Sequence, residues 1–147
     1  MIFSLDALLA EAVWDLHCGG IRVAVVTGGH WPAVHRPVRE LLGDGAVEVL
    51  VTGDELSRPK PDPEIYRHAL WQLGIRAADA MAVEDSAPGL RAAVAAGLAT
   101  VVVTTEHSAG DDFTGAAAVL SGYQACEQLS VHGCRRMLLG SQPRLTA

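Results

Sequence analysis

Residues 21–29 read Ile-Arg-Val-Ala-Val-Val-Thr-Gly-Gly, an almost wholly apolar run, rich in β-branched side chains, that ends at two glycines. A run of this kind, without alternating polar residues, is typical of a strand that is buried on both faces of a parallel sheet. Parallel strands need crossover connections, which are usually helices. The sequence around this run should therefore alternate between helices and further strands.

Helical and strand-like patterns do alternate on both sides of the run. Strands are expected at residues 21–26, 47–52, 80–83, 99–104 and, as a short edge strand, 116–120. Helices are expected at residues 5–18, 32–42, 63–73 and 88–96. Ser4 is placed to cap the first of them, and Tyr66 falls on the apolar face of the third. This order predicts an α/β fold with a doubly wound, parallel, Rossmann-like sheet and helices on both faces. Residues 1–120 are expected to form a partial core domain, and residues 121–147 a C-terminal tail that is weakly structured or a short helix.

The composition excludes several classes of function. Half of the 147 residues are apolar, 19% are charged and the net charge is -6, so no basic surface for nucleic acid is expected. The apolar runs are shorter than a membrane span needs. The 3 cysteines are too few for a disulfide framework. We therefore expect a cytoplasmic protein that binds neither nucleic acid nor membrane.

One lysine and two carboxylates stand next to predicted strand and helix ends. Lys60 lies between two prolines just ahead of a predicted helix, and Glu84 and Asp85 follow a predicted strand. Carboxylate oxygens suit Mg²⁺ and a fixed ammonium suits a phosphoryl group, so these segments predict a phosphoryl-transfer site. Two other interpretations stay open. Lys60 can be a solvated loop side chain, and the carboxylates can stabilise the N-terminus of the following helix.

A third element of this site is expected where the first buried strand ends. Thr27 is followed by Gly28 and Gly29, whose backbone can offer N–H groups to an anion while the threonine hydroxyl donates beside them. This pattern predicts a phosphate cradle. A simple turn after the strand is the other interpretation.

Taken in chain order, three segments resemble the haloacid dehalogenase-like hydrolase superfamily. They are the strand that ends at Thr27, Lys-Pro-Asp-Pro-Glu-Ile-Tyr at residues 60–66, and Val-Glu-Asp-Ser-Ala-Pro-Gly-Leu at residues 83–90. The sequence is similar to the branch that contains β-phosphoglucomutase and sugar-phosphate phosphatases. The resemblance implies a magnesium-dependent phosphatase or phosphomutase whose substrate is a small phosphorylated metabolite, in particular a sugar phosphate.

The resemblance also assigns roles to individual residues. The implied site consists of Thr27 and Lys60 for catalysis, Thr27, Gly28, Gly29 and Lys60 for phosphate binding, and Glu84 and Asp85 for Mg²⁺. In this scheme Lys60 steadies both the phosphate and the nucleophile that attacks it, and the paired acids place the metal ion.

One part of the family pattern has no counterpart. The sequence lacks the nucleophile motif Asp-x-Asp-Gly-Thr and the cap domain that follows it, and Asp6 and Asp15 fall within a helical pattern. The central first strand of the sheet is therefore expected to be absent, and the aspartyl-phosphate route is expected to be closed.

Two hypotheses of different kinds follow from this absence. The chain can be a truncated or split hydrolase, inactive alone, whose partner is a separate N-terminal fragment or a second copy. The alternative is a catalytically inactive remnant that binds phosphate, a metal or a partner. A receiver-like domain is disfavoured because the acidic pair follows the lysine.

Overall fold

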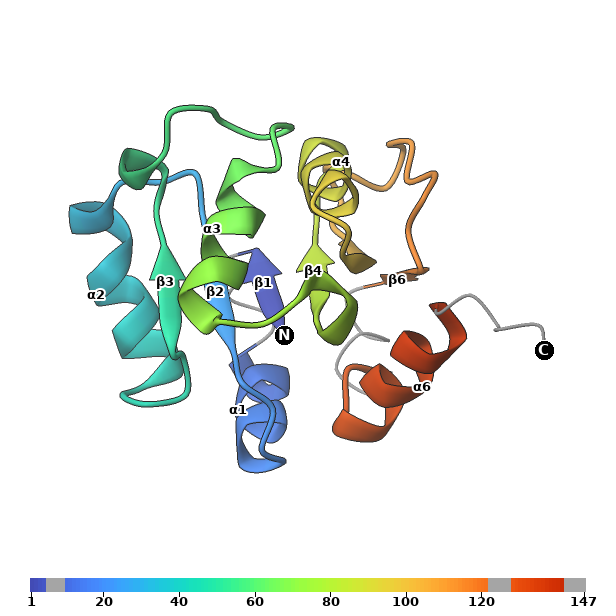
Figure 1. Ribbon diagram of the computed structural model, residues 1–147, viewed down its shortest axis with the longest axis horizontal. Helices are drawn as coiled ribbons and strands as arrows, with labels where there is room; N and C mark the ends of the chain where they lie inside the picture. Colours follow the sequence, from blue (N-terminus) through green and yellow to red (C-terminus); the bar gives the residue numbers. More distant parts are fainter. Residues whose placement is uncertain (5–9, 122–127, 142–147) are drawn as a thin grey trace.

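The computed structural model describes residues 1–4, 10–121 and 128–141. Within these residues, 6 strands form one parallel sheet in the order β3-β2-β1-β4-β5-β6 (Figure 1). The strands are β1 (Ile2–Ser4), β2 (Ala24–Val26), β3 (Val49–Val51), β4 (Met81–Glu84), β5 (Ala99–Thr104) and β6 (Ala118–Ser121). The helices are α1 (Ala10–Cys18), α2 (Trp31–Leu42), α3 (Glu64–Leu73), α4 (Ala87–Ala95) and α6 (Val131–Ser141). The predicted α/β Rossmann-like fold is confirmed.

Two apolar cores cover the two faces of the sheet. One contains the buried residues of α1 and α2 together with Phe3, and Leu129 and Cys134 join it from the C-terminal part of the chain. The other contains the buried residues of α3, together with Ala92 and Ala93 of α4 and Ile2 of β1. Since neighbouring residues of a strand point to opposite faces, Ile2 and Phe3 fill different cores. The sheet is therefore covered on both sides, as its apolar strands require.

The prediction that the central strand is absent was wrong. Residues Ile2–Ser4 form β1, which pairs in parallel with both β2 and β4, so Ile2 lies beside Ala24 on one side and Ala82 on the other. A strand of 3 residues is too short to show a pattern of its own. The helically spaced apolar residues that follow it made Ser4 look like a helix cap. The sheet thus has neither a gap nor a direct contact between β2 and β4.

The predicted helix at residues 5–18 is partly described. Asp15 lies on α1 and is exposed, as its helical pattern indicated, whereas Asp6 lies outside the described residues. Of the predicted tail, residues 122–127, which include Cys126, and residues 142–147 lie outside the described part. Leu129 is fully buried and precedes α6, so this segment contributes to the core.

The two cysteines of the described part differ in their exposure. Within the described part, Cys18 is exposed and Cys134 is buried, and both are free thiols. Burial raises the pKa of Cys134 to about 11, so this thiol stays protonated at neutral pH.

None of the helices in residues 1–4, 10–121 and 128–141 combines the length and the apolar character that crossing a bilayer demands.

The central position of β1 makes Phe3 a test of the fold. The side chain is 2% exposed and lies in the core with α1 and α2. We expect Phe3→Ala to lower the free energy of unfolding by about 3–5 kcal/mol, because it removes a large buried ring and leaves a cavity. Val119→Ala on β6 is the control, since Val119 is 50% exposed. Equal losses in urea denaturation would contradict a central β1.

Candidate functional site

Three strand ends meet at the carboxyl edge of the sheet. Ser4 pairs with Val26, the residue before Thr27, and Phe3 pairs with Val83, the residue before Glu84. Thr27, Ser4 and Glu84 therefore lie on three adjacent strands at the same edge. In open parallel sheets this edge is where ligands usually bind.

Lys60 reaches this edge from the loop before α3. Its Nζ lies 2.5 Å from Oε1 of Glu84 and 3.2 Å from Oγ of Ser4. The side chain of Lys60 is only 17% exposed and that of Glu84 is 0% exposed. The interpretation of Lys60 as a solvated loop side chain is thus wrong. Lys60 is also the single lysine of the chain.

Glu84 is enclosed by hydrogen-bond donors. Its Oε1 accepts from the ammonium of Lys60 and from the hydroxyl of Tyr66. Its Oε2 accepts from the backbone N–H of Asp85 at 3.2 Å and from Oγ of Ser86 at 3.4 Å. Burial raises the pKa of Tyr66 well above its ordinary value, and the neighbouring Glu84 adds to this effect, so the phenol stays a donor. A buried carboxylate needs such partners.

The first turn of α4 closes over the same carboxylate. Ser86 caps the helix, because its Oγ accepts from the backbone N–H of Gly89 at 3.2 Å. A Cβ on Gly89 would lie only 2.0 Å from Oε2 of Glu84. Gly89 is therefore needed where the helix passes the carboxylate. The sequence correctly indicated a helix start here, and Ser86 supplies the cap.

The loop after β2 lies beside the loop after β3. Oγ1 of Thr27 accepts from the N–H of Gly29 at 3.1 Å, which leaves the hydroxyl proton of Thr27 for another acceptor. The carbonyl of Gly29 accepts from the N–H of Gly53 at 2.8 Å. A Cβ on Gly53 would lie 2.3 Å from the carbonyl oxygen of Gly28. The glycines thus allow the two loops to touch.

The predicted site residues are only partly in contact. Lys60 donates hydrogen bonds to Glu84 and to Ser4, which was not predicted. Gly28 and Lys60 do not touch in this way but line the same cavity of about 280 Å³. The cavity is lined by Gly28, Gly53, Leu56, Ser57, Arg58, Pro59, Lys60 and Ile65. Asp85 is half-buried beside Glu84. A phosphate-sized anion would have Lys60 on one side and the glycine loop on the other.

Sequence reasoning missed two residues of this site. Ser4 looked like a helix cap, and Tyr66 was assigned only to the apolar face of α3. Tyr66 is fully buried, as that assignment indicated, but its hydroxyl bonds Glu84. The one available signal was chemical, because a buried tyrosine hydroxyl usually has a partner.

Magnesium was predicted at Glu84 and Asp85. In the part of the chain that the structure describes, no group of three or more His, Cys, Asp or Glu side chains is placed to hold a metal ion. Both oxygens of Glu84 accept hydrogen bonds from the protein itself. Because Mg²⁺ requires near-octahedral oxygen coordination, these described residues alone do not fit the ion.

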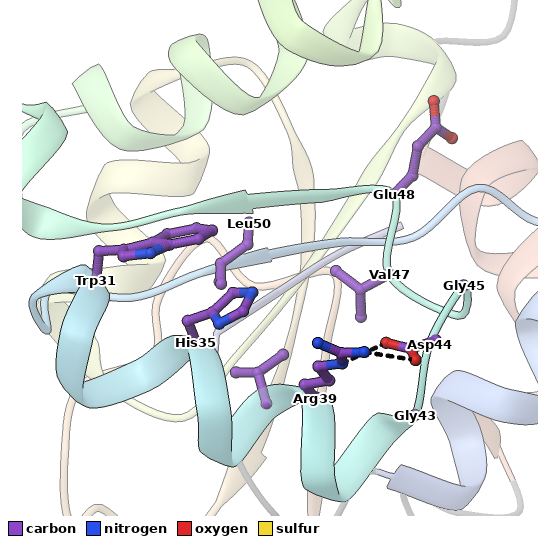
Figure 2. Close-up of a pocket in the computed structure, with 10 residues that line it drawn as sticks. Trp31, His35, Arg39, Gly43, Asp44, Gly45, Val47, Glu48 and Leu50 are labelled. Atoms are coloured by element: carbon purple, nitrogen blue, oxygen red, sulfur yellow. Dashed lines mark hydrogen bonds and ion pairs between the residues drawn. The ribbon is translucent and has the colours of Figure 1, made fainter.

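A second hollow lies between α2 and the edge strand β3 (Figure 2). Its volume is also about 280 Å³, and the rings of Trp31 and His35 stack on its wall at 4.5 Å between centroids. Its charges are already paired, since Arg39 contacts Asp44 at 2.6 Å and Glu48 bonds Arg22. The side chain of Arg39 is 61% exposed, so water and salt screen its charge more than that of Lys60, and this hollow is the weaker candidate for an anion.

Comparisons with known proteins agree on one family. A family model described as haloacid dehalogenase-like hydrolase matches residues 5–97. Protein CbbY of Cereibacter sphaeroides is 36% identical over 118 residues, which cover 78% of this chain and 51% of that protein. The chain spans about half the length of the curated relatives it matches first.

Solved structures give the same picture. CbbY from Rhodobacter sphaeroides in complex with phosphate matches with a TM-score of 0.77 and 34% identity, over 88% of this chain and 58% of that one. A mutant of the same protein, in complex with xylulose-(1,5)bisphosphate, matches with a TM-score of 0.77 and 33% identity over the same shares.

The close approach of Gly89 to Glu84 can be tested directly. Gly→Ala inside a helix usually stabilises a protein by about 0.5–1 kcal/mol. We expect the opposite for Gly89→Ala, a loss of more than about 1 kcal/mol, because the new methyl group must displace the carboxylate of Glu84. The control is Gly110→Ala, where an added Cβ meets nothing within 4 Å. A stabilised Gly89→Ala variant in chemical denaturation would show that Glu84 is not held against α4.

Proposed function

The chain belongs to the haloacid dehalogenase-like hydrolases, and we propose that its carboxyl strand edge binds the phosphoryl group of a small phosphorylated metabolite. We propose further that the activity to which this site belongs is that of a sugar-phosphate phosphatase or phosphomutase. One observation carries the proposal. The single lysine of the chain is fixed at that edge by Glu84 and Ser4, next to a glycine loop.

The roles of the individual groups follow from their chemistry. Lys60 supplies a positive charge that is held in place, so little reorganisation is needed when a phosphoryl group arrives. Thr27 can donate its hydroxyl proton, and the backbone around Gly28 can approach closely because no side chain intervenes. Gly29 is the weaker part of the predicted cradle, because its N–H already donates to Thr27.

The substrate class is supported by the relatives and by the site. A CbbY structure contains xylulose-(1,5)bisphosphate, a doubly phosphorylated sugar. The cavity beside Lys60 holds about 280 Å³, near the lower end of the range for small-molecule pockets. The chain spans about half the length of CbbY, so we assign only the phosphoryl group, and not the sugar, to the described residues.

Turnover requires more than binding. Hydrolysis of a phosphate monoester breaks the P–O bond to the alcohol, water supplies the new oxygen, and the alcohol leaves with a proton. In the described part, the β1 residue next to Lys60 is Ser4, a hydroxyl rather than the carboxylate that an aspartyl-phosphate route needs. This observation favours the second candidate function, a module that binds phosphate without hydrolysing it. That this chain lacks a nucleophilic aspartate stays a proposal.

Magnesium dependence is a separate proposal. Hydrolases of this family are generally metal-dependent, and the resemblance implies Glu84 and Asp85 as ligands. Both carboxylate oxygens of Glu84 already accept hydrogen bonds from the protein. Calorimetric titration with phosphate in Mg²⁺ and in EDTA tests this proposal. Equal affinities in the two buffers would refute it.

Phosphate binding is the first test of the proposed function. We expect inorganic phosphate to bind the wild-type chain and Thr27→Val to weaken binding about tenfold, because a hydrogen bond to a charged group is lost. The double variant Lys60→Met with Glu84→Gln removes the cation without leaving a buried charge unpaired, and we expect it not to bind. Thr104→Val is the matched control, since this strand-end hydroxyl donates to the carbonyl of Leu120. Wild-type affinity in both test variants would contradict the proposal.

Hydrolysis of p-nitrophenyl phosphate separates the two candidate functions. We expect the wild-type chain to stay at the background rate with Mg²⁺ present, because Ser4 stands beside Lys60. Turnover that disappears in Thr27→Val would show that the chain is an enzyme by itself. Ser4→Asp is the informative variant, since a gain of turnover would show that only the carboxylate is missing.

A further inference from the structure

The hydroxyl of Tyr66 bonds the same carboxylate oxygen as the ammonium of Lys60. We propose that Tyr66 is a positioning residue for Lys60, which acts through Glu84 so that the ammonium stays available to an anion near Ser4. This inference rests on the proposed function and names a residue that determines how strongly the site binds phosphate.

Three groups define the place of the ammonium. Glu84 accepts at 2.5 Å, Ser4 accepts at 3.2 Å, and the ring centroid of Tyr66 lies 5.5 Å from Nζ. A cation within about 6 Å of an aromatic ring can be attracted by it, although the interaction is weak. Lys60 is therefore placed by two residues of the strand ends and by one residue of α3.

Tyr66 acts on Lys60 through Oε1 of Glu84, which accepts from both side chains. In a buried site, an ion pair whose oxygen has no other donor is strongly attractive, and the ammonium is drawn fully toward the carboxylate. The hydroxyl of Tyr66 takes part of the accepting capacity of Oε1, which weakens the hold of Glu84 on Lys60. The ammonium can then direct more of its donor strength toward Ser4 and a bound anion.

Contacts of α3 with the core and with the loop before it fix the positions of Tyr66 and Lys60 relative to each other. Tyr66 is fully buried in the core between α3 and the sheet. The carboxylate of Glu64, at the start of α3, accepts from the backbone N–H groups of Ser57 at 3.1 Å and Arg58 at 2.9 Å. The loop that carries Lys60 is thus tied to the same helix that carries Tyr66, so the helix fixes both ends of the contact.

The single lysine allows a direct experiment. A chain grown with ¹³C,¹⁵N-labelled lysine contains one labelled side chain, whose ¹⁵Nζ resonance can be recorded through the Cε protons. Tyr66→Phe retains the buried ring and removes only the hydroxyl. We expect the ¹⁵Nζ resonance of Lys60 to shift in this variant without any ligand, and the Kd for inorganic phosphate to rise at least threefold.

The matched control is Leu73→Val on the same helix. Leu73 is 3% exposed and lies in the same core, so this variant lowers stability without touching Glu84. We expect its ¹⁵Nζ resonance and its phosphate affinity to equal those of the wild type. A shift of equal size in both variants would mean that general loosening of α3 moves Lys60, which would overturn the inference.

The outcomes separate this inference from the proposed function. An unshifted ¹⁵Nζ resonance in Tyr66→Phe overturns the positioning role, even if the wild type binds phosphate. A shifted resonance in a chain that binds no phosphate supports the positioning role and refutes the proposed function. A shifted resonance with unchanged phosphate affinity refutes the claim that Tyr66 acts on anion binding.

Discussion

The ion pair between Lys60 and Glu84 is the interaction on which the site depends. A buried charge without a partner is strongly unfavourable, so each group fixes where the other must lie. The pair joins the loop before α3 to the end of β4, 24 residues further along the chain. Tyr66, Ser86 and Gly89 are arranged around the same carboxylate. The site is thus organised from its centre outward.

The short central strand decides what this ion pair faces. Because β1 lies between β2 and β4, Ser4 is placed between the end of the Thr27 strand and Glu84. The hydroxyl of Ser4 can accept a hydrogen bond from Lys60 and donate one to an anion. Without an activating base it is a poorer nucleophile than the carboxylate that an aspartyl-phosphate route uses. The proposed phosphate site therefore does not depend on whether the chain hydrolyses what it binds.

The sequence predicted the elements whose patterns are long and missed those that depend on single contacts. The helical spacing of apolar residues located α3, and a continuous apolar run located β5. Gly74 adopts a φ of 64° where the sequence placed the end of α3. No periodicity can show in the three residues of β1. Lys60 and Tyr66 contact Glu84 from 24 and 18 residues away in the chain, which spacing alone does not reveal. The role of Glu84 as a metal ligand stays a prediction beside the ion pair that the structure shows.

A double-mutant cycle on the ion pair tests the account most directly. The free energy of unfolding is measured for the wild type, Lys60→Met, Glu84→Gln and the double variant. If Lys60 and Glu84 form the buried pair on which the site depends, the single variants together lose more unfolding free energy than the double variant does. The difference, which is the coupling energy, is expected to be about 2 kcal/mol or more. Additive losses, with a coupling energy near zero, would contradict it.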